Sequence, residues 1–184
     1  MTGHKSLEQK CRFETERLSI KSWKSCVTEL SNEKEFAEDV INILTEPVTK
    51  SLPDGWQRIN DTIKANDWIK RRAEESAFLA IQLLPTLEVV GFLFLYESKA
   101  SDNSIELRLG YLLSESVWGK GLGSELIKGL VEWCEKQNNI KSISGGVEIE
   151  NTGSIRVLEK NGFSIVQPKD SQENVVVLER RFNQ

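Results

Sequence analysis

Hydrophobic and polar positions alternate along this chain with two different periods, one typical of strands and one of helices. The N-terminal half predicts, in order, a strand (12–22), one broken helix or two short ones (24–45), a loop (46–55) and a charged helix (57–75). The loop contains two prolines and an Asp-Gly pair, which favour turns. In the charged helix Ile59 and Ile63, with Trp68 or Ile69, are expected to face inward.

The C-terminal half changes to apolar runs that are partly β-branched. Residues 77–84 and 89–96 form two such runs around a short Pro-containing segment, which predicts a hairpin. The later predicted elements are a strand (105–113), a one-sided helix (122–137), a strand (141–147), a helix (152–161) and two strands (163–166 and 174–182). This order predicts a mixed α/β sheet with at least one parallel crossover.

Composition and charge limit the classes of protein to which this chain can belong. The 184 residues show no repeat or linker, so we expect one domain over 12–184 after a disordered or extended tail over 1–11. A net charge of -4 gives no reason to expect nucleic acid or a membrane as partner. The polar N-terminus lacks the apolar core of a secretory signal, and no apolar run is long enough to span a bilayer. A cytoplasmic location is therefore expected.

Histidine and cysteine usage limits the available chemistry. His4 is the single histidine, so Ser-His-Asp and Cys-His mechanisms lose their usual base and histidine-rich zinc sites are excluded. Cys11, Cys26 and Cys134 are dispersed, which suits reduced thiols better than a disulfide framework. Cys134 lies on the apolar face of its predicted helix and is expected to be a core thiol rather than a nucleophile.

The most specific segment is Gly119-Lys120-Gly121-Leu122-Gly123, where a predicted strand and a short loop lead into a helix. Glycines permit positive φ and let backbone N–H groups approach an anion. The helix N-terminus adds N–H donors and the positive end of the helix dipole. The spacing fits neither the dinucleotide pattern nor the nucleotide P-loop. A pyrophosphate cradle is one interpretation, and a flexible turn is the other.

Three segments resemble one family. Gly119–Gly123 resembles motif A of the GNAT acetyltransferases, and Asn151–Phe163 resembles motif B, N-x-x-S-x-x-v-L-E-K-x-G-F. Thr15–Leu18 is similar to the T-x-R-L opening of the RimJ/RimL-like branch, the ribosomal-protein N-terminal acetyltransferases. The resemblance implies a single-domain GNAT fold of the α/β class. Its mixed, mostly antiparallel, twisted sheet carries helices on both faces and a central parallel βαβ crossover.

The resemblance also implies a binding site for acetyl-CoA as cosubstrate, without a metal. The residues implied are Tyr111, Leu112, Leu113, Trp118, Gly119, Lys120, Gly121, Leu122, Gly123, Ser124, Asn151 and Ser154. Asn151 and Ser154 are expected to face the pantetheine arm, although Asn151 is also a good helix N-cap. Trp118 replaces the Gln or Arg of motif A and is expected to pack under the cofactor or in the core.

For the acetyl transfer itself, the resemblance implies that a backbone N–H of the strand around Tyr111 stabilises the oxyanion. Ser154 and Glu106 are the candidate catalytic side chains. Ser154 is proposed as donor to the sulfur because Leu158 stands where the family often has tyrosine. Glu106 is the candidate base, and an ion pair with Arg108 on the same strand face is the alternative.

The function implied is direct transfer of acetyl from acetyl-CoA to an amine, either a protein N-terminal α-amine or a small-molecule amine. An α-amine has a pKa of about 7.7–8.0 against about 10.4 for lysine, so a site without an obvious strong base suits a weakly basic acceptor. An acetyl-CoA-binding sensor or accessory protein with little catalysis is the alternative. A phosphate-binding domain for another nucleotide is a third interpretation. We expect a monomer or a homodimer.

Overall fold

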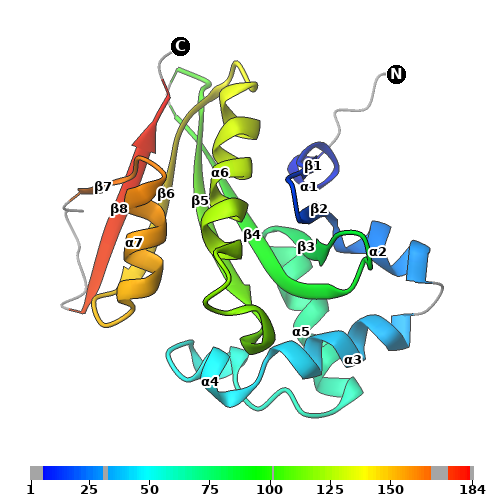
Figure 1. Cartoon of the computed structure of the whole chain (residues 1–184). Coiled ribbons are helices and arrows are strands. Elements are labelled where there is room, and N and C mark those ends of the chain that lie inside the picture. Colours follow the sequence, from blue (N-terminus) through cyan, green and yellow to red (C-terminus); the bar gives the residue numbers. More distant parts are fainter. Residues whose placement is uncertain (1–5, 31–32, 101, 167–173, 183–184) are drawn as a thin grey trace, which may run out of the picture. The chain divides into compact units, whose positions relative to one another are not determined.

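The computed structural model describes residues 6–30, 33–100, 102–166 and 174–182. The helices are α1 (Leu7–Lys10), α2 (Trp23–Leu30), α3 (Glu33–Ile43), α4 (Glu46–Thr49), α5 (Thr62–Glu75), α6 (Leu122–Glu135) and α7 (Thr152–Lys160), with 3₁₀ turns η1 (Asp54–Trp56) and η2 (Glu115–Val117). The strands are β1 (Phe13–Glu14), β2 (Leu18–Ser22), β3 (Ala77–Leu83), β4 (Val89–Lys99), β5 (Ile105–Leu113), β6 (Ile140–Glu148), β7 (Ser164–Val166) and β8 (Val175–Arg181) (Figure 1).

The strands follow the order β1-β2-β3-β4-β5-β6-β8-β7. Strands β1 and β2, β2 and β3, β6 and β8, and β7 and β8 pair antiparallel. Strands β5 and β6 pair parallel and are joined by α6. The predicted mixed α/β fold and its parallel crossover are therefore confirmed.

The chain forms two compact units. Unit 1 comprises Met1–Phe94 and Tyr111–Lys120, and unit 2 comprises Leu95–Gly110 and Gly121–Gln184. Strands β4 and β5 each contribute residues to both units. Two unit boundaries fall inside the continuous strands β4 and β5, and the third falls between Lys120 and Gly121, before α6. The single domain over 12–184 stays a prediction.

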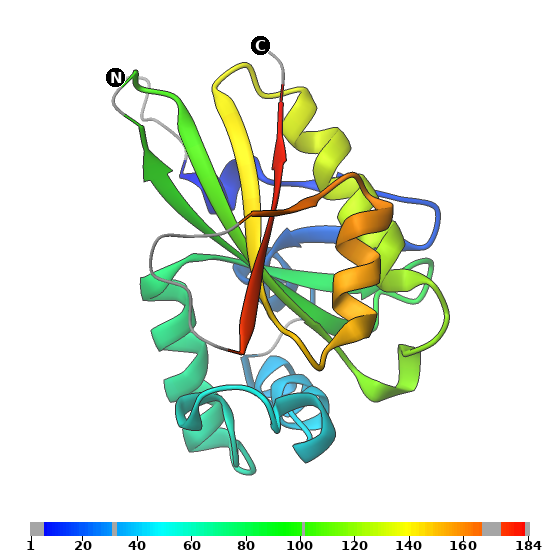
Figure 2. The same cartoon turned by 90° about the vertical axis from the view of Figure 1, so that its left-hand side faces the viewer.

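Unit 1 has an aromatic core. Helices α3 and α5 lie side by side (Figures 1 and 2), and the core rings are those of Trp23, Phe36, Trp56, Trp68, Phe78, Phe92 and Phe94. Phe78 stacks on Phe94 with ring centroids 5.1 Å apart. Burial of each large apolar side chain stabilises the fold by about 1.5–3 kcal/mol. Trp68 and Ile69 face inward as predicted, but the inward placement of Ile63 was wrong, because this side chain lies on the opposite face and is 75% exposed.

Unit 2 is built around α6 and α7, which lie side by side on one face of β6 and β8 (Figures 1 and 2). Leu126, Leu130 and Cys134 recur along α6 at intervals of four residues and are fully buried. Burial raises the pKa of the Cys134 thiol to about 12, so it carries almost no thiolate at neutral pH. The prediction of a core thiol is confirmed.

Two predictions about the N-terminal half need correction. The segment predicted as a loop over 46–55 contains α4 and η1, because Pro47 lies in the first turn of α4, where its missing N–H costs nothing. The predicted tail over 1–11 contains α1, which begins with a capping box between Ser6 and Gln9. Residues 1–5 lie outside the described residues. Of the two alternatives predicted over 24–45, the structure shows two helices, α2 and α3.

Candidate functional site

The glycine-rich segment, residues 119–123, follows a loop over residues 114–118 that belongs to unit 1. The indole N–H of Trp118 donates to the carbonyl of Leu113, the last residue of β5, at 2.8 Å. The ammonium of Lys120 donates to the carbonyl of Ser116 at 2.7 Å. These two hydrogen bonds hold the loop backbone between the end of β5 and the first glycines.

Trp118 is not a core residue, because 49% of it is exposed. The placement in the core was therefore wrong, and packing under the cofactor stays a prediction. Leu112 and Leu113 are buried at the end of β5, whereas Tyr111 is only partly buried. The side chains of the two leucines fill the core, so any contact they make with a ligand involves their backbone.

Two glycines in this segment have left-handed backbone. Gly119 has φ +71° and Gly121 has φ +77°, a region that costs other residues roughly 1–2 kcal/mol. A Cβ on Gly119 would meet no atom within 4 Å. The space beside Gly119 is therefore open.

Gly121 is also the N-cap of α6, and it supplies no side-chain cap. The other long helices with assigned N-caps differ, because Asp61 caps α5 and Asn151 caps α7 through their side chains. The Glu125 N–H donates to the Gly121 carbonyl at 3.1 Å and makes the first hydrogen bond of the helix. The N–H groups of Leu122, Gly123 and Ser124 precede it and have no acceptor within the helix. The first turn of α6 thus presents backbone donors at the positive end of the helix dipole.

Helix α7 holds the second group of candidate residues. The Asn151 side-chain oxygen accepts from the Ser154 N–H at 3.1 Å, so Asn151 acts as the N-cap. Ser154 is partly buried and lies in the first turn. Leu158 is 1% exposed and packs in the core. The apolar residue at the family's tyrosine position therefore has a packing role.

The C-terminal end of α7 is joined to the first turn of α6. The side-chain amide of Asn161 donates to Ser124 at 3.3 Å, both to its carbonyl and to its hydroxyl. Arg180 donates to the Asn161 carbonyl at 2.6 Å and forms an ion pair with Glu135 at 2.8 Å. Ser154 lies about 10 Å along the helix axis from Asn161. This network holds the C-terminal end of α7 against the first turn of α6.

Glu106 and Arg108 occupy the exposed face of β5, and Leu107 and Leu109 occupy the buried face, as the alternation predicted. The guanidinium of Arg108 lies 4.8 Å above the ring of Tyr96. No ion pair joins Glu106 to Arg108 in the part of the chain that the structure describes. The pKa of the Arg181 guanidinium on β8 is raised by its hydrogen bond to Glu179 and, to a smaller extent, by the negative charge of Glu106. The role of Glu106 as a base stays a prediction.

Strands β5 and β6 are paired over only part of their length. Their pairs run from Ile105 with Ile140 to Arg108 with Ser144, whereas β6 stays paired with β8 as far as Glu148. Among the described residues of unit 2, no pair with β6 follows Arg108. A Cβ on Gly110, two residues later, would meet nothing within 4 Å. The strand face at Gly110 is thus open, and its backbone has no pair with β6 among the described residues of unit 2.

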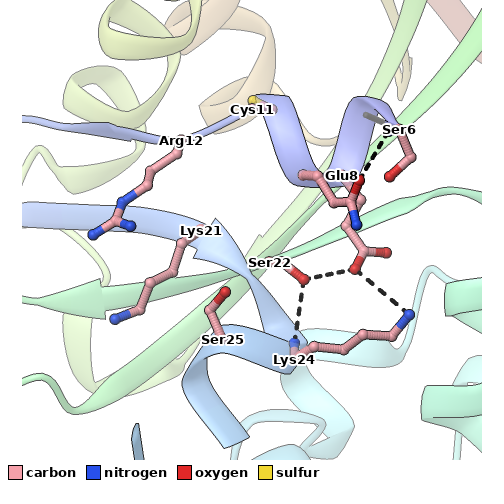
Figure 3. Close-up of a pocket in the computed structure, with 9 residues that line it drawn as sticks. Ser6, Glu8, Cys11, Arg12, Lys21, Ser22, Lys24 and Ser25 are labelled. Atoms are coloured by element: carbon pink, nitrogen blue, oxygen red, sulfur yellow. Dashed lines mark hydrogen bonds and ion pairs between the residues drawn. The ribbon is translucent and has the colours of Figure 1, made fainter. Parts of the chain in front are cut away.

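Unit 1 contains a separate polar pocket of about 290 Å³ (Figure 3). Its lining residues are Ser6, Glu8, Gln9, Cys11, Arg12, Lys21, Ser22, Lys24 and Ser25. The Glu8 carboxylate accepts from the Ser22 hydroxyl at 2.6 Å and lies 4.0 Å from the Lys24 ammonium. None of the sequence-predicted site residues lines this pocket.

The candidate residues are divided between the two units. Residues 111–113 and 118–120 lie in unit 1, and Glu106, residues 121–124, Asn151 and Ser154 lie in unit 2. Within unit 2, the structure joins α6 and α7 through Asn161, for which the sequence pattern predicted only a position at the end of a helix. A side-chain amide at the end of a helix was the available signal, but its acceptor on α6 is 37 residues away.

No helix within the described residues is both long and apolar enough to cross a bilayer.

Comparison with known proteins identifies the family. The model of the acetyltransferase (GNAT) domain matches residues 26–164. The uncharacterized N-acetyltransferase p20 of Bacillus licheniformis is 38% identical over 55 residues, which are 30% of this chain and 31% of that protein. The aligned segment thus spans about a third of the length of that curated relative.

Two solved structures share the fold. A GNAT-family acetyltransferase from Bacillus anthracis superposes with a TM-score of 0.72 at 16% identity, over 93% of this chain and 98% of that one. The ribosomal L7/L12 alpha-N-protein acetyltransferase RimL, solved with coenzyme A, gives 0.70 at 16% identity, over 94% and 98%. Because the family model covers most of the chain, this protein belongs to the GNAT acetyltransferase family.

Proposed function

We propose that this protein is an acetyl-CoA-dependent N-acetyltransferase that transfers the acetyl group directly to an amine. The observation that carries the proposal is the start of α6, where Gly121 has left-handed backbone and leaves the first helical turn without a side-chain cap. Family membership and the motif B helix support the same conclusion.

The residues at the start of α6 fit a pyrophosphate. The N–H groups of Leu122, Gly123 and Ser124 have no acceptor within the helix, and an anion there is stabilised by the helix dipole. The N-cap Gly121 has no Cβ that would crowd an anion bound to these groups.

The reaction forms a bond between the amine nitrogen and the acetyl carbon and breaks the bond between that carbon and sulfur. The oxyanion that develops needs a donor, and we assign it to a backbone N–H of β5 near Gly110, beyond the last pair with β6. Ser154 donates a hydrogen bond to the departing thiolate. Glu106 accepts the proton that the amine loses.

The acceptor class we propose is a weakly basic amine, a protein N-terminal α-amine or a small-molecule amine. Roughly a tenth of an α-amine is neutral at pH 7, against well under a thousandth of a lysine amine. This difference favours an α-amine at a site whose one candidate base is an exposed carboxylate. The structurally similar RimL is named for acetylation of a ribosomal protein's α-amine, which supports the same class.

Thermal unfolding tests the cofactor assignment. Acetyl-CoA at about 100 times its Kd is expected to stabilise the folded protein by about 2.7 kcal/mol, seen as a raised Tm. Gly121→Asp is expected to abolish the rise, because it places a carboxylate in the cradle. Gly55→Asp is the matched control, since it adds the same charge where a Cβ meets nothing within 4 Å. Stabilisation by ATP or NAD and not by acetyl-CoA would refute the proposal.

An acceptor screen tests the catalysis. Peptides with free α-amines, small amines and lysine peptides blocked at their N-termini are supplied with acetyl-CoA, and released thiol is measured. We expect α-amines or small amines to release thiol faster than the blocked lysine peptides at pH 7. Binding of acetyl-CoA without thiol release from any amine would favour the sensor alternative.

A further inference from the structure

The T-x-R-L segment at the start of β2 has a tightly held backbone. The Thr15 N–H donates to the Leu18 carbonyl at 2.8 Å, and the Leu18 N–H donates to the Thr15 hydroxyl at 3.0 Å. The Arg17 carbonyl accepts from the Leu84 N–H at 2.9 Å. Thr15 thus closes a turn that fixes the direction in which the Arg17 side chain leaves the backbone.

The Arg17 side chain reaches the glycine-rich segment. Its guanidinium donates through Nη1 to the carbonyl of Lys120 at 3.0 Å, across 103 residues of sequence. Both residues belong to unit 1. The Lys120 side chain is held separately by Ser116, so the carbonyl and the ammonium of Lys120 have different partners.

The hydrogen bond from Arg17 to the Lys120 carbonyl also fixes the direction of the Gly121 N–H. The peptide group is planar and trans, so the carbonyl of Lys120 and the N–H of Gly121 point in opposite directions. A donor that holds the carbonyl therefore sets the direction of the Gly121 N–H. Glycine at 121 has no Cβ to restrain its φ, and a peptide next to it rotates easily without such a tether.

We propose that Arg17 is a positioning residue that orients the Lys120–Gly121 peptide so that the Gly121 N–H faces the bound phosphate. The inference rests on the proposed function, because it requires a pyrophosphate at the start of α6. Arg17 then acts without touching the reacting atoms. Its side chain is exposed, and an exposed hydrogen bond of this kind contributes little to folding stability.

Ligand binding to Arg17→Met tests the role. The Kd of coenzyme A and that of S-acetylpantetheine, which lacks the pyrophosphate, are measured by calorimetry and by thermal shift. We expect Arg17→Met to raise the Kd of coenzyme A about tenfold, the effect of one weakened hydrogen bond to a charged group, and to leave S-acetylpantetheine binding unchanged. Arg12→Met is the matched control, because it removes the same charge from another exposed arginine five residues earlier.

The amide resonance of Gly121 gives a readout that a general structural role would not move. In glycine-labelled protein, coenzyme A is expected to shift this resonance in the wild type and in Arg12→Met, and to shift it much less in Arg17→Met. Arg17→Lys keeps a donor for the Lys120 carbonyl and is expected to restore the Kd to within about threefold of the wild type.

Three outcomes would overturn the inference. An unchanged Kd in Arg17→Met shows that the tether does not matter for binding. An equal rise in the Kd of coenzyme A and of S-acetylpantetheine shows a general effect on the fold. An equal rise in the Kd of coenzyme A in Arg17→Met and Arg17→Lys shows that loss of the hydrogen bond to Lys120 does not cause the weaker binding. Failure of the wild type itself to bind coenzyme A is distinct from these, because it refutes the proposed function.

Discussion

Asp39 on α3 gives a pH-dependent stability that can be tested directly. Its carboxyl is half-buried, and burial, with the negative charges of Glu35, Glu88 and Glu38, raises its pKa from the ordinary value of 3.8 to about 6. The unfolded chain loses this proton near pH 3.8 and the folded chain near pH 6. Between these values the folded state binds more protons, so the stability falls as the pH rises through this window.

The size of the effect follows from the two pKa values. A difference of about two pKa units corresponds to about 3 kcal/mol of unfolding free energy if the carboxyl feels it in full. Solvent screens part of it because the group is only half-buried, so we expect about 1.5 kcal/mol. Asp39→Asn removes the charge and should be more stable than the wild type by this amount at pH 7.5.

Urea unfolding between pH 4 and pH 7.5 measures the effect for both proteins. The advantage of Asp39→Asn is expected to be near zero at pH 4 and to grow to its full value above pH 6. Asp67→Asn is the matched control, because it removes an exposed carboxylate on α5 and should change stability by less than about 0.5 kcal/mol at any pH. A constant difference across the range, or a less stable Asp39→Asn at pH 7.5, would refute the reasoning.

Two further predictions concern catalysis. Ser154→Ala should lower kcat more than it raises the KM for acetyl-CoA, because the contact of the hydroxyl to sulfur strengthens as the thiolate leaves. The N-cap bond from the backbone N–H of residue 154 to Asn151 survives this change. Thr152→Ala, at an exposed position, is the control, and an unchanged kcat in Ser154→Ala would show that Ser154 has only a packing role. Glu106→Gln should cut kcat by roughly 10²–10⁴-fold and remove the acidic limb of the pH–rate profile with acetyl-CoA binding intact. Glu97→Gln, on the exposed end of β4, should leave the rate unchanged, and loss of stability without loss of rate in Glu106→Gln would show a structural role.

Much of the fold could be read from local patterns. The strand over Ile105–Leu113 has the predicted bounds, and α6 and α7 begin at the predicted residues. Strict alternation of apolar and polar residues in strands, and one-sided apolar spacing in helices, follow directly from which side chains are buried. Glycine and asparagine at helix starts follow from the backbone conformation and capping that a helix start requires. Ile63 was misplaced because apolar character alone does not say which helix face meets the core.

The sequence by itself determined the family, the left-handed glycines before α6 and the cap at Asn151, because each depends on residues close together in the chain. Only the tertiary structure decided which distant groups hold these residues in place. Arg17 reaches Lys120 across 103 residues, and Asn161 reaches Ser124 across 37. Such hydrogen bonds depend on strand order and helix packing, which bring together residues whose local sequence gives no sign of the partner. Local sequence therefore predicts helix starts and caps, and only the fold supplies the long-range contacts that hold them.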